Sequence, residues 1–323
     1  MSDSTFFDAR VRPVIFPHPP SDAPVLTLVV GQPGAGVARA SSHFIGDDLP
    51  AKLSAGDLRT FHPQHLDQSR SPEGLSPLTE ATTEWMRSAL NYARTTRRSL
   101  SLDGTRSTLD LALATTNLFG KSGFETTVVV VAVPRTESLL ATASKFLLDS
   151  RSGRPSTFTS IAEHDASFEA ARALVHTLES APTVDRLTIL GRDGVSRFDS
   201  LRTDAAAFGG ATAALDRERA TALPSPQAMR WLSELRAMTD YAMSSRQVER
   251  PLADVLIELH EIGIREVLPR LPLPKDSQAR PAAEASLGRQ LVAIRQAVPV
   301  TRRVQPQPGP VVSMPEPDRG ISL

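Results

Sequence analysis

The sequence predicts an α/β fold with a mainly parallel sheet, followed by a C-terminal helical appendage. Two patterns indicate this fold class. Up to about residue 200, short β-branched runs alternate with amphipathic helical stretches, as in βαβ units. Beyond that point, apolar residues recur only at the spacing of helices. The 323 residues are enough for one large domain, or for one domain with a smaller addition.

Four segments are predicted as strands. Residues 25–30 form a β-branched run that ends at Gly31, as a buried parallel strand should. Residues 99–102 form a weaker strand, which ends at Asp103-Gly104. Residues 126–133 are the clearest strand, because they contain a run of valines that ends at Pro134. Residues 187–190 are expected to be the last strand of the sheet.

Helices are predicted between these strands and beyond them. The first four lie at residues 78–98, 109–118, 137–148 and 161–180, each with an apolar face. In the C-terminal part, Ser225-Pro226 is a good helix start, because proline suits the first helical position. Three apolar stripes then predict packing helices: Met229, Leu232, Leu235, Met238 and Met243; Leu252, Val255, Leu256, Leu259 and Ile262; Leu287, Leu291, Ile294 and Val298.

Proline clusters mark the two ends of the chain. We expect a Pro-rich N-terminal arm at residues 1–24, the α/β domain at 25–200, the helical appendage at 201–300 and a disordered Pro-rich tail at 301–323. The N-terminal arm lacks the apolar core of a secretory signal, and no window approaches the roughly 18 apolar residues of a membrane span. The expectation is a cytoplasmic protein with no membrane partner.

Composition excludes several classes of function. The 36 basic and 36 acidic side chains balance, so the basic footprint of a nucleic-acid-binding protein is absent. The absence of cysteine excludes thiol nucleophiles, Fe–S clusters and cysteine-ligated zinc. The histidines form no i, i+4 pair, so no metal site is predicted. The only lysines are Lys52, Lys121, Lys145 and Lys275, so almost every cation is an arginine.

A glycine-rich loop follows the first predicted strand. Its residues are Gly31-Gln32-Pro33-Gly34-Ala35-Gly36, called here the glycine loop. A strand, a glycine-rich turn and a helix start form the usual setting of a phosphate-binding loop, whose backbone N–H groups cradle phosphate oxygens. The alternative is a tight strand-to-helix turn without a ligand.

The glycine loop lacks the two side chains that complete a phosphate-binding motif. The motif G-x-x-x-x-G-K-[ST] places a lysine and a hydroxyl where this chain has Val37 and Ala38. The lysine reaches the β- and γ-phosphates, and the hydroxyl holds Mg²⁺. Loss of one such preorganised group costs on the order of 3 kcal/mol. Arg39 is the nearest cation, although its guanidinium is larger and differently directed.

Five motifs in order resemble the zeta-toxin family of P-loop kinases, over about residues 25–200. The glycine loop is close to the family's G-Q-P-G-[AS]-G-K-[ST]. The other four are the run from Leu53 to Pro63 with its His62-Pro63, Asp103-Gly104-Thr105, Ala132-Val133-Pro134 with Ser138, and His164-Asp165. The resemblance implies a P-loop kinase-like three-layer sandwich. It also implies a bacterial enzyme that uses ATP and Mg²⁺ to phosphorylate UDP-N-acetylglucosamine, with a small helical antitoxin as partner.

Carried over by position, the resemblance assigns candidate residues and shows departures from the family pattern. The general-base aspartate falls on Gly56, with Asp57 adjacent as a displaced candidate. One phosphate-binding arginine falls on Lys145. The other falls on Thr157, with Arg151 and Arg154 in the same loop. A substrate-contacting glutamate falls on Arg87. The remaining candidates for the substrate are Arg59, His62, Asp103, Thr105, Arg106 and Thr115.

Three hypotheses follow. The first, which the combined losses favour, is an impaired kinase or pseudokinase that keeps the fold and a weak or purely structural cleft. The second is an active but altered kinase, in which Arg39, Lys145 and Arg151 or Arg154 replace the missing cations and Asp57 is the base. The third is a non-catalytic protein-interaction module, in which the apolar stripes beyond residue 225 bind a partner.

Overall fold

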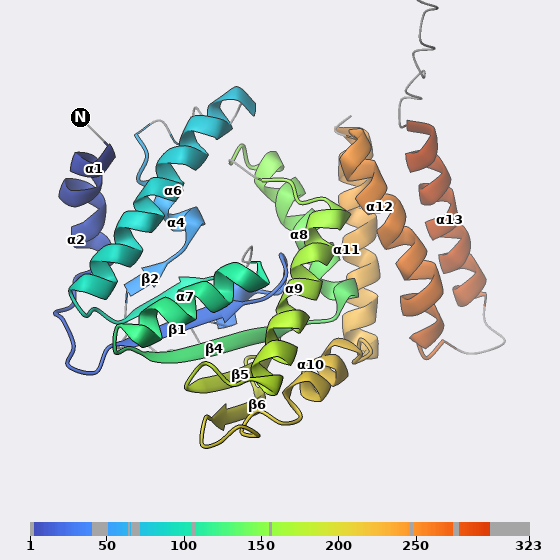
Figure 1. The fold of residues 1–323 in the computed structure, drawn as a ribbon. Coiled ribbons are helices and arrows are strands. Elements are labelled where there is room, and N and C mark those ends of the chain that lie inside the picture. The colour runs from blue at the N-terminus through green and yellow to red at the C-terminus, as the bar shows by residue number, and fades with distance from the viewer. Residues whose placement is uncertain are drawn as a thin grey trace, which may run out of the picture.

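A six-stranded sheet forms the centre of the protein (Figure 1). The computed structural model describes residues 3–40, 51–63, 65, 72–104, 108–154, 157–245, 248–273 and 278–297. The strand order is β2-β3-β1-β4-β5-β6, and every pair is parallel except β5 with β6. The strands are β1 (Val25–Val30), β2 (Ala51–Leu53), β3 (Leu100–Asp103), β4 (Glu125–Ala132), β5 (Arg186–Gly191) and β6 (Ser196–Leu201). The predicted α/β class and mainly parallel sheet are confirmed.

The order of the strands places the glycine loop at the centre of one sheet edge. Strand β1 lies between β3 and β4, with Leu28 opposite Leu102 on one side and Val128 on the other. After β1 the chain forms β2 and β3 on one side of β1, and then crosses to β4 on the other side. In open α/β sheets, ligands bind at such a switch point, beyond the carboxyl ends of the strands.

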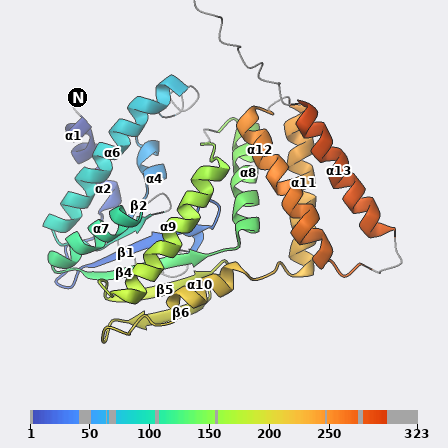
Figure 2. The same cartoon turned by 45° about the vertical axis from the view of Figure 1, so that its right-hand side comes forward.

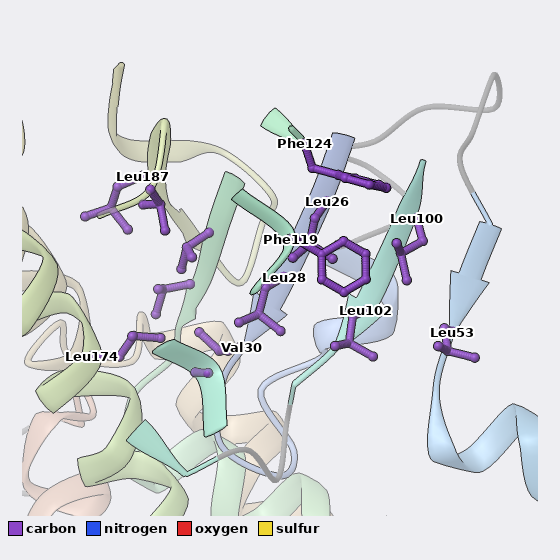
Figure 3. Close-up of a cluster of buried hydrophobic side chains, with 14 of the residues drawn as sticks. Leu26, Leu28, Val30, Leu53, Leu100, Leu102, Phe119, Phe124, Leu174 and Leu187 are labelled. Atoms are coloured by element: carbon purple, nitrogen blue, oxygen red, sulfur yellow. The ribbon is translucent and has the colours of Figure 1, made fainter. Parts of the chain in front are cut away.

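Helices pack against the sheet and around it. Helices α7 (Leu109–Lys121) and α9 (Ile161–Ser180) lie on one face, where Phe119 of α7 packs over Leu26 and Leu28 (Figure 3). The other helices are α1 (Asp3–Phe6), α2 (Arg12–Ile15), α4 (Ala55–Thr60), α6 (Pro72–Thr95), α8 (Arg135–Arg151), α10 (Ala211–Arg219), α11 (Ser225–Ser244), α12 (Arg250–Ile262) and α13 (Ala279–Ala297). No helix in the described ranges is long and apolar enough to cross a membrane.

The C-terminal helices pack on α8 rather than on the sheet (Figure 2). Leu139, Leu140 and Leu147 of α8 share one apolar cluster with the inward faces of α11, α12 and α13. The stripe predicted for α12 is buried throughout, from Leu252 to Ile262. The prediction that Met229 of α11 faces the core was wrong, because its exposed fraction is 60% and Trp231 points inward instead. Val298 of the third stripe lies outside the described residues.

Strand β6 is a feature that the sequence did not predict, since residues 187–190 were expected to be the last strand. Its side chains are exposed or half-buried, so it carries no apolar run. It pairs antiparallel with β5, and Asp199 accepts hydrogen bonds from Arg186 and Thr188 of that strand. Backbone pairing and polar cross-strand contacts therefore form an edge strand that hydropathy does not reveal.

The N-terminal segment is helical from Asp3 to Ile15 and irregular from there to β1. Phe7, Val11 and Ile15 are buried, and Phe6 stacks on Trp85 of α6 with ring centroids 5.4 Å apart. This segment therefore belongs to the packed body, although prolines dominate its end. The disordered tail predicted at residues 301–323 lies outside the described residues.

Truncation tests the packing of the C-terminal helices. A chain ending at residue 220 is expected to aggregate, because the apolar face of α8 loses its cover. Size-exclusion chromatography with light scattering measures this. A chain ending at residue 297 is the control and should stay in the same oligomeric state as the full chain. A monomeric, folded product ending at residue 220 would contradict the packing.

Candidate functional site

The glycine loop connects β1 to a helical turn that begins at Val37. Gly34 and Gly36 both have φ of +82°, in the region that favours glycine. A Cβ on Gly34 would lie 2.0 Å from the carbonyl oxygen of Ser138, so the loop rests directly on the first turn of α8. A Cβ on Gly36 would meet nothing within 4 Å. The outer side of the loop is thus open, as a phosphate cradle requires.

Gln32 anchors the loop from behind. Its side chain is fully buried, and its Nε2 donates to the carbonyl oxygen of Val133 at 2.8 Å and to Ser138 Oγ at 3.1 Å. Its Oε1 lies 3.5 Å from Nη2 of Arg219. One amide side chain therefore ties the loop to the end of β4, to α8 and to α10.

Behind Gln32, a buried polar chain continues through Ser138, His164 and Asp165. Ser138 Oγ lies 2.9 Å from His164 Nε2, and His164 Nδ1 lies 2.9 Å from Asp165 Oδ1. Because the Asp165 carboxylate accepts a hydrogen bond from Nδ1–H of His164, Nε2 of the neutral imidazole accepts the hydrogen bond of the Ser138 hydroxyl. The residue order is that of a hydrolase triad, but the side chains of Ser138 and His164 are fully buried. The arrangement supports the loop and has no access for a substrate.

The polar chain ends at the C-terminal helices. Arg135 donates from Nε and Nη2 to both oxygens of Asp165, at 2.8 and 2.9 Å, and from Nη1 to Glu258 of α12 at 2.8 Å. Partial burial opposes ionisation of Asp165, but the hydrogen bonds from Arg135 and His164 outweigh it and lower the pKa of that carboxyl. Burial lowers the pKa of the His164 imidazole. The network thus keeps a neutral histidine between an ionised carboxylate and a hydroxyl.

Val37 occupies the position of the missing lysine and points inward. Its exposed fraction is 5%, and it packs with Val29, Val131 and Leu190 on the sheet face opposite α7 and α9. Its Cγ2 would lie 3.0 Å from a Cβ on Gly31. Ala38 supplies no hydroxyl, and no cluster of metal-ligating side chains occurs in the described ranges. The loop backbone therefore fits a phosphate group, whereas the residues after it do not fit Mg²⁺.

The three cations expected to bind phosphate, Lys145 and Arg151 of α8 and Arg154 just after it, are engaged in other contacts. Lys145 pairs with Asp149, and Arg154 donates to the same carboxylate from Nε at 3.0 Å. The guanidinium of Arg151 lies over the ring of Tyr241, 5.8 Å from its centroid. Partial burial of Asp149 opposes ionisation, but the hydrogen bonds from both cations lower the pKa of the carboxyl. Each of the three cations is therefore held by a contact of its own, although Asp149 is the one carboxylate that these contacts include.

The candidate base and its neighbours lie on the short helix α4. Asp57 accepts a hydrogen bond from the Ser54 hydroxyl at 2.7 Å. Its own backbone N–H donates to Ser54 Oγ, so Ser54 is the N-cap of the helix. Nη1 of Arg59 lies 3.5 Å from Thr157 Oγ1. The ring of His62 lies 5.9 Å from Trp85. Asp57 is exposed, and a structural contact occupies its carboxylate.

Of the remaining substrate candidates, the structure describes Asp103 and Thr115. Asp103 ends β3, and the next N–H, that of Gly104, donates to the carbonyl of Val29 at 2.7 Å. Thr115 donates to its own helix, to Leu111, at 2.8 Å. The cavity beside Gly31 and Gly104 measures only about 10 Å³, roughly the space of one water molecule. Thr105 and Arg106 lie outside the described residues.

Arg219 is a site residue that the sequence did not indicate. Its side chain is 8% exposed, and its guanidinium lies 3.7 Å from the ring centroid of Phe168. Its Nε and Nη1 have no hydrogen-bond partner in the part of the chain that the structure describes. Burial lowers its pKa to about 10. A lone arginine at the end of a surface helix carries no local signal, because only the packing of α10 against α9 buries it.

The buried histidine predicts a loss of stability in acid. Because burial lowers its folded pKa below 6.5, His164 binds a proton less readily when folded, so its contribution is complete above pH 6.5 and falls as pH decreases below that value. Urea unfolding at pH 7.5 and 5.5 measures the difference. In His164→Gln the difference should be smaller than in the wild type. An equal difference in both proteins would contradict this role of His164.

Comparisons with known proteins agree with this architecture. The zeta toxin family model matches residues 9–203. The chain is 25% identical over 191 residues to "Toxin zeta" of Enterococcus hirae and, equally, to that of Streptococcus pyogenes. These alignments span 56% of this chain and only 65% of each relative's length.

One solved structure shares the fold. It comes from the PezAT chromosomal toxin–antitoxin system of Streptococcus pneumoniae, with a TM-score of 0.58 and 18% identity. The match covers 74% of this chain and 98% of the other. At this identity the likeness shows the fold alone, and the family is shown by the sequence match, which extends over more than half of the chain. The chain belongs to the zeta-toxin family.

Proposed function

We propose that this chain is a zeta-toxin-like P-loop protein that keeps a ligand-binding cleft but has lost phosphoryl transfer. One observation carries this proposal: Val37 replaces the loop lysine and is buried in an apolar cluster. The apolar contacts of its side chain leave no mobile cation at that position. In P-loop enzymes the lysine and the metal neutralise the charge that develops on the phosphates.

The losses combine in one direction. The family reaction is ATP-dependent phosphorylation of UDP-N-acetylglucosamine, which needs a cation, Mg²⁺ and a base. All three are missing, because the chain has Val37, Ala38 and Gly56 at the positions of the lysine, the metal-binding hydroxyl and the base. Loss of a single preorganised group already lowers the rate about a hundredfold or more. ATP and the UDP-sugar are therefore proposed as ligands of a pseudokinase, with affinity and without turnover.

The altered-kinase alternative requires free cations and a free base. The ion pairs of Lys145 and Arg154 with Asp149, and the position of Arg151 over Tyr241, weigh against it. Asp57 is held in the cap of α4. Of the four cations that this alternative names, Arg39 alone has neither an ion pair nor an aromatic contact within the described residues.

The protein-interaction alternative is weakened by the packing of the C-terminal helices, whose apolar stripes are largely buried inside the chain. We still propose a partner, because the chain belongs to the zeta-toxin family. The PezAT structure is that of a toxin–antitoxin system. We infer that a small helical antitoxin is the class of partner to seek.

A turnover assay tests the loss of catalysis. Purified protein with ATP, Mg²⁺ and UDP-N-acetylglucosamine should release ADP no faster than the background, because Val37, Ala38 and Gly56 supply neither the cation, nor the metal ligand, nor the base. Coupled measurement of ADP detects the reaction. Turnover above background that disappears in Arg39→Gln would establish the altered kinase instead.

Restoration of the motif is the complementary test. The variant Val37→Lys/Ala38→Ser/Gly56→Asp should gain ADP release or toxicity on expression, since the fold and the glycine loop are retained. A matched control, Val37→Met/Ala38→Ser/Gly56→Asp, fills the same position without charge and should stay inactive. Circular dichroism confirms that both variants fold. Equal inactivity of two folded variants would mean that further parts of the site are lost.

A further inference from the structure

Helix α13 lies at the outer side of the C-terminal part and packs on α11 and α12 (Figures 1 and 2). Of its side chains, Leu287 and Ile294 are buried. Its polar contacts lie at the surface: Arg295 pairs with Glu261 of α12 at 2.9 Å, with exposed fractions of 54% and 35%. Exposed ion pairs add little to stability. A small apolar contact therefore holds α13 in place.

A buried histidine of α12 lies against this helix. The side chain of His260 has no exposed surface. Its Nδ1 lies 2.8 Å from the carbonyl oxygen of Leu256, one turn earlier in α12, and its Nε2 lies 3.4 Å from Oε1 of Gln290 in α13. The ring of His260 therefore has an oxygen atom next to each of its two nitrogens.

The neutral ring cannot satisfy both oxygens. The amide of Gln290 is fixed in orientation, because its Nε2 donates to Oδ1 of Asp240 in α11 at 2.8 Å and an ionised carboxylate only accepts. A neutral imidazole carries one proton, so whichever nitrogen holds it, the other nitrogen is an acceptor that faces an acceptor. A buried acceptor without a donor opposes the docking of α13.

A second proton supplies the missing donor but places a charge inside the apolar cluster of α8, α11, α12 and α13. Burial lowers the pKa of His260 below its ordinary value of 6.5, and it outweighs the hydrogen bonds to Leu256 and Gln290 and the charge of Asp240, which raise that pKa. Water can hydrate the charged ring when α13 withdraws.

Asp240 is the charge that acts on the ring. The other charged groups on the elements around it have partners of their own: Arg295 of α13 with Glu261, Arg135 of α8 with Glu258, and Arg236 of α11 with the hydroxyl of Ser286. Asp240 reaches the ring through the amide of Gln290, which belongs to α13. Its stabilising effect on a charged ring therefore does not offset burial while α13 is docked.

We propose that α13 is a proton-sensitive strap on α12, which undocks when His260 takes up a proton. The undocked ring has the ordinary pKa of 6.5 and the docked ring a lower one, so protons bind the undocked form preferentially. Docking is strongest above about pH 6.5 and weakens as the pH falls below that value. This device is independent of any ligand of the glycine loop, although α12 also carries Glu258, the partner of Arg135.

Amide hydrogen exchange of the full chain at pH 7.5 and 5.5, corrected for the intrinsic exchange rate, tests the strap. Protection of the α13 amides should fall several-fold at pH 5.5. The limit is about tenfold, which is the change in protonation of a free imidazole over this range. In His260→Leu the fall should shrink to less than about twofold. His176→Gln, which changes an exposed histidine of α9, is the matched control and should keep the wild-type fall.

A second variant tests the orientation of the amide and does not depend on a substitution in the core. In Asp240→Asn the new amide can donate to Gln290, so the Gln290 amide can turn and donate to the neutral ring. Protection of α13 should then rise at pH 7.5 and fall by a larger factor at pH 5.5.

Three outcomes would overturn the strap. They are an unchanged protection of α13 in the wild type at pH 5.5, the same fall in His260→Leu as in the wild type, and lower protection of Asp240→Asn at pH 7.5. A fall that is equal in α13 and in β4 would show global unfolding and would overturn it as well. The ADP-release assay is a separate readout, so failure of the strap and failure of the proposed function are distinguishable.

Discussion

The buried side chain of Gln32 is the contact on which the rest of the site depends. It holds the glycine loop against the end of β4 and the first turn of α8, and it opens a polar chain through Ser138, His164 and Asp165 to Arg135. Every member of that chain has a hydrogen-bond partner. A satisfied buried network adds rigidity, whereas one missing member would leave unpaired groups that cost about 1–3 kcal/mol each.

The same network connects the loop to the C-terminal helices. Arg135 donates to Asp165 of α9 and to Glu258 of α12. Helix α8 provides both this arginine and the apolar face on which α11 and α12 pack. The helices beyond residue 225 are therefore part of the framework that holds the loop.

Val37 shows how a local departure changes the chemistry of an intact framework. The glycines keep the positive φ angles and the open outer side of a phosphate cradle, while Val37 joins the valines of β1 and β4 below it. Apolar packing and a mobile ammonium group exclude each other at one position, because an unpaired charge buried among valines is expensive. The glycine loop thus keeps the geometry of a phosphate cradle, while the lysine and the metal-binding hydroxyl are absent.

The sequence alone determined the alternating β/α order, the strand at 25–30, the glycine loop and the absence of its lysine, because these are local patterns of period, turn residues and motif. It did not reveal β6, the inward turn of Trp231 in place of Met229, or the burial of Arg219. Only the tertiary structure decided which charges meet between elements: Arg135 of α8 pairs with Asp165 of α9 and with Glu258 of α12. Charge pairing depends on side chains from separate elements, and their distances are set by packing, which no local pattern encodes.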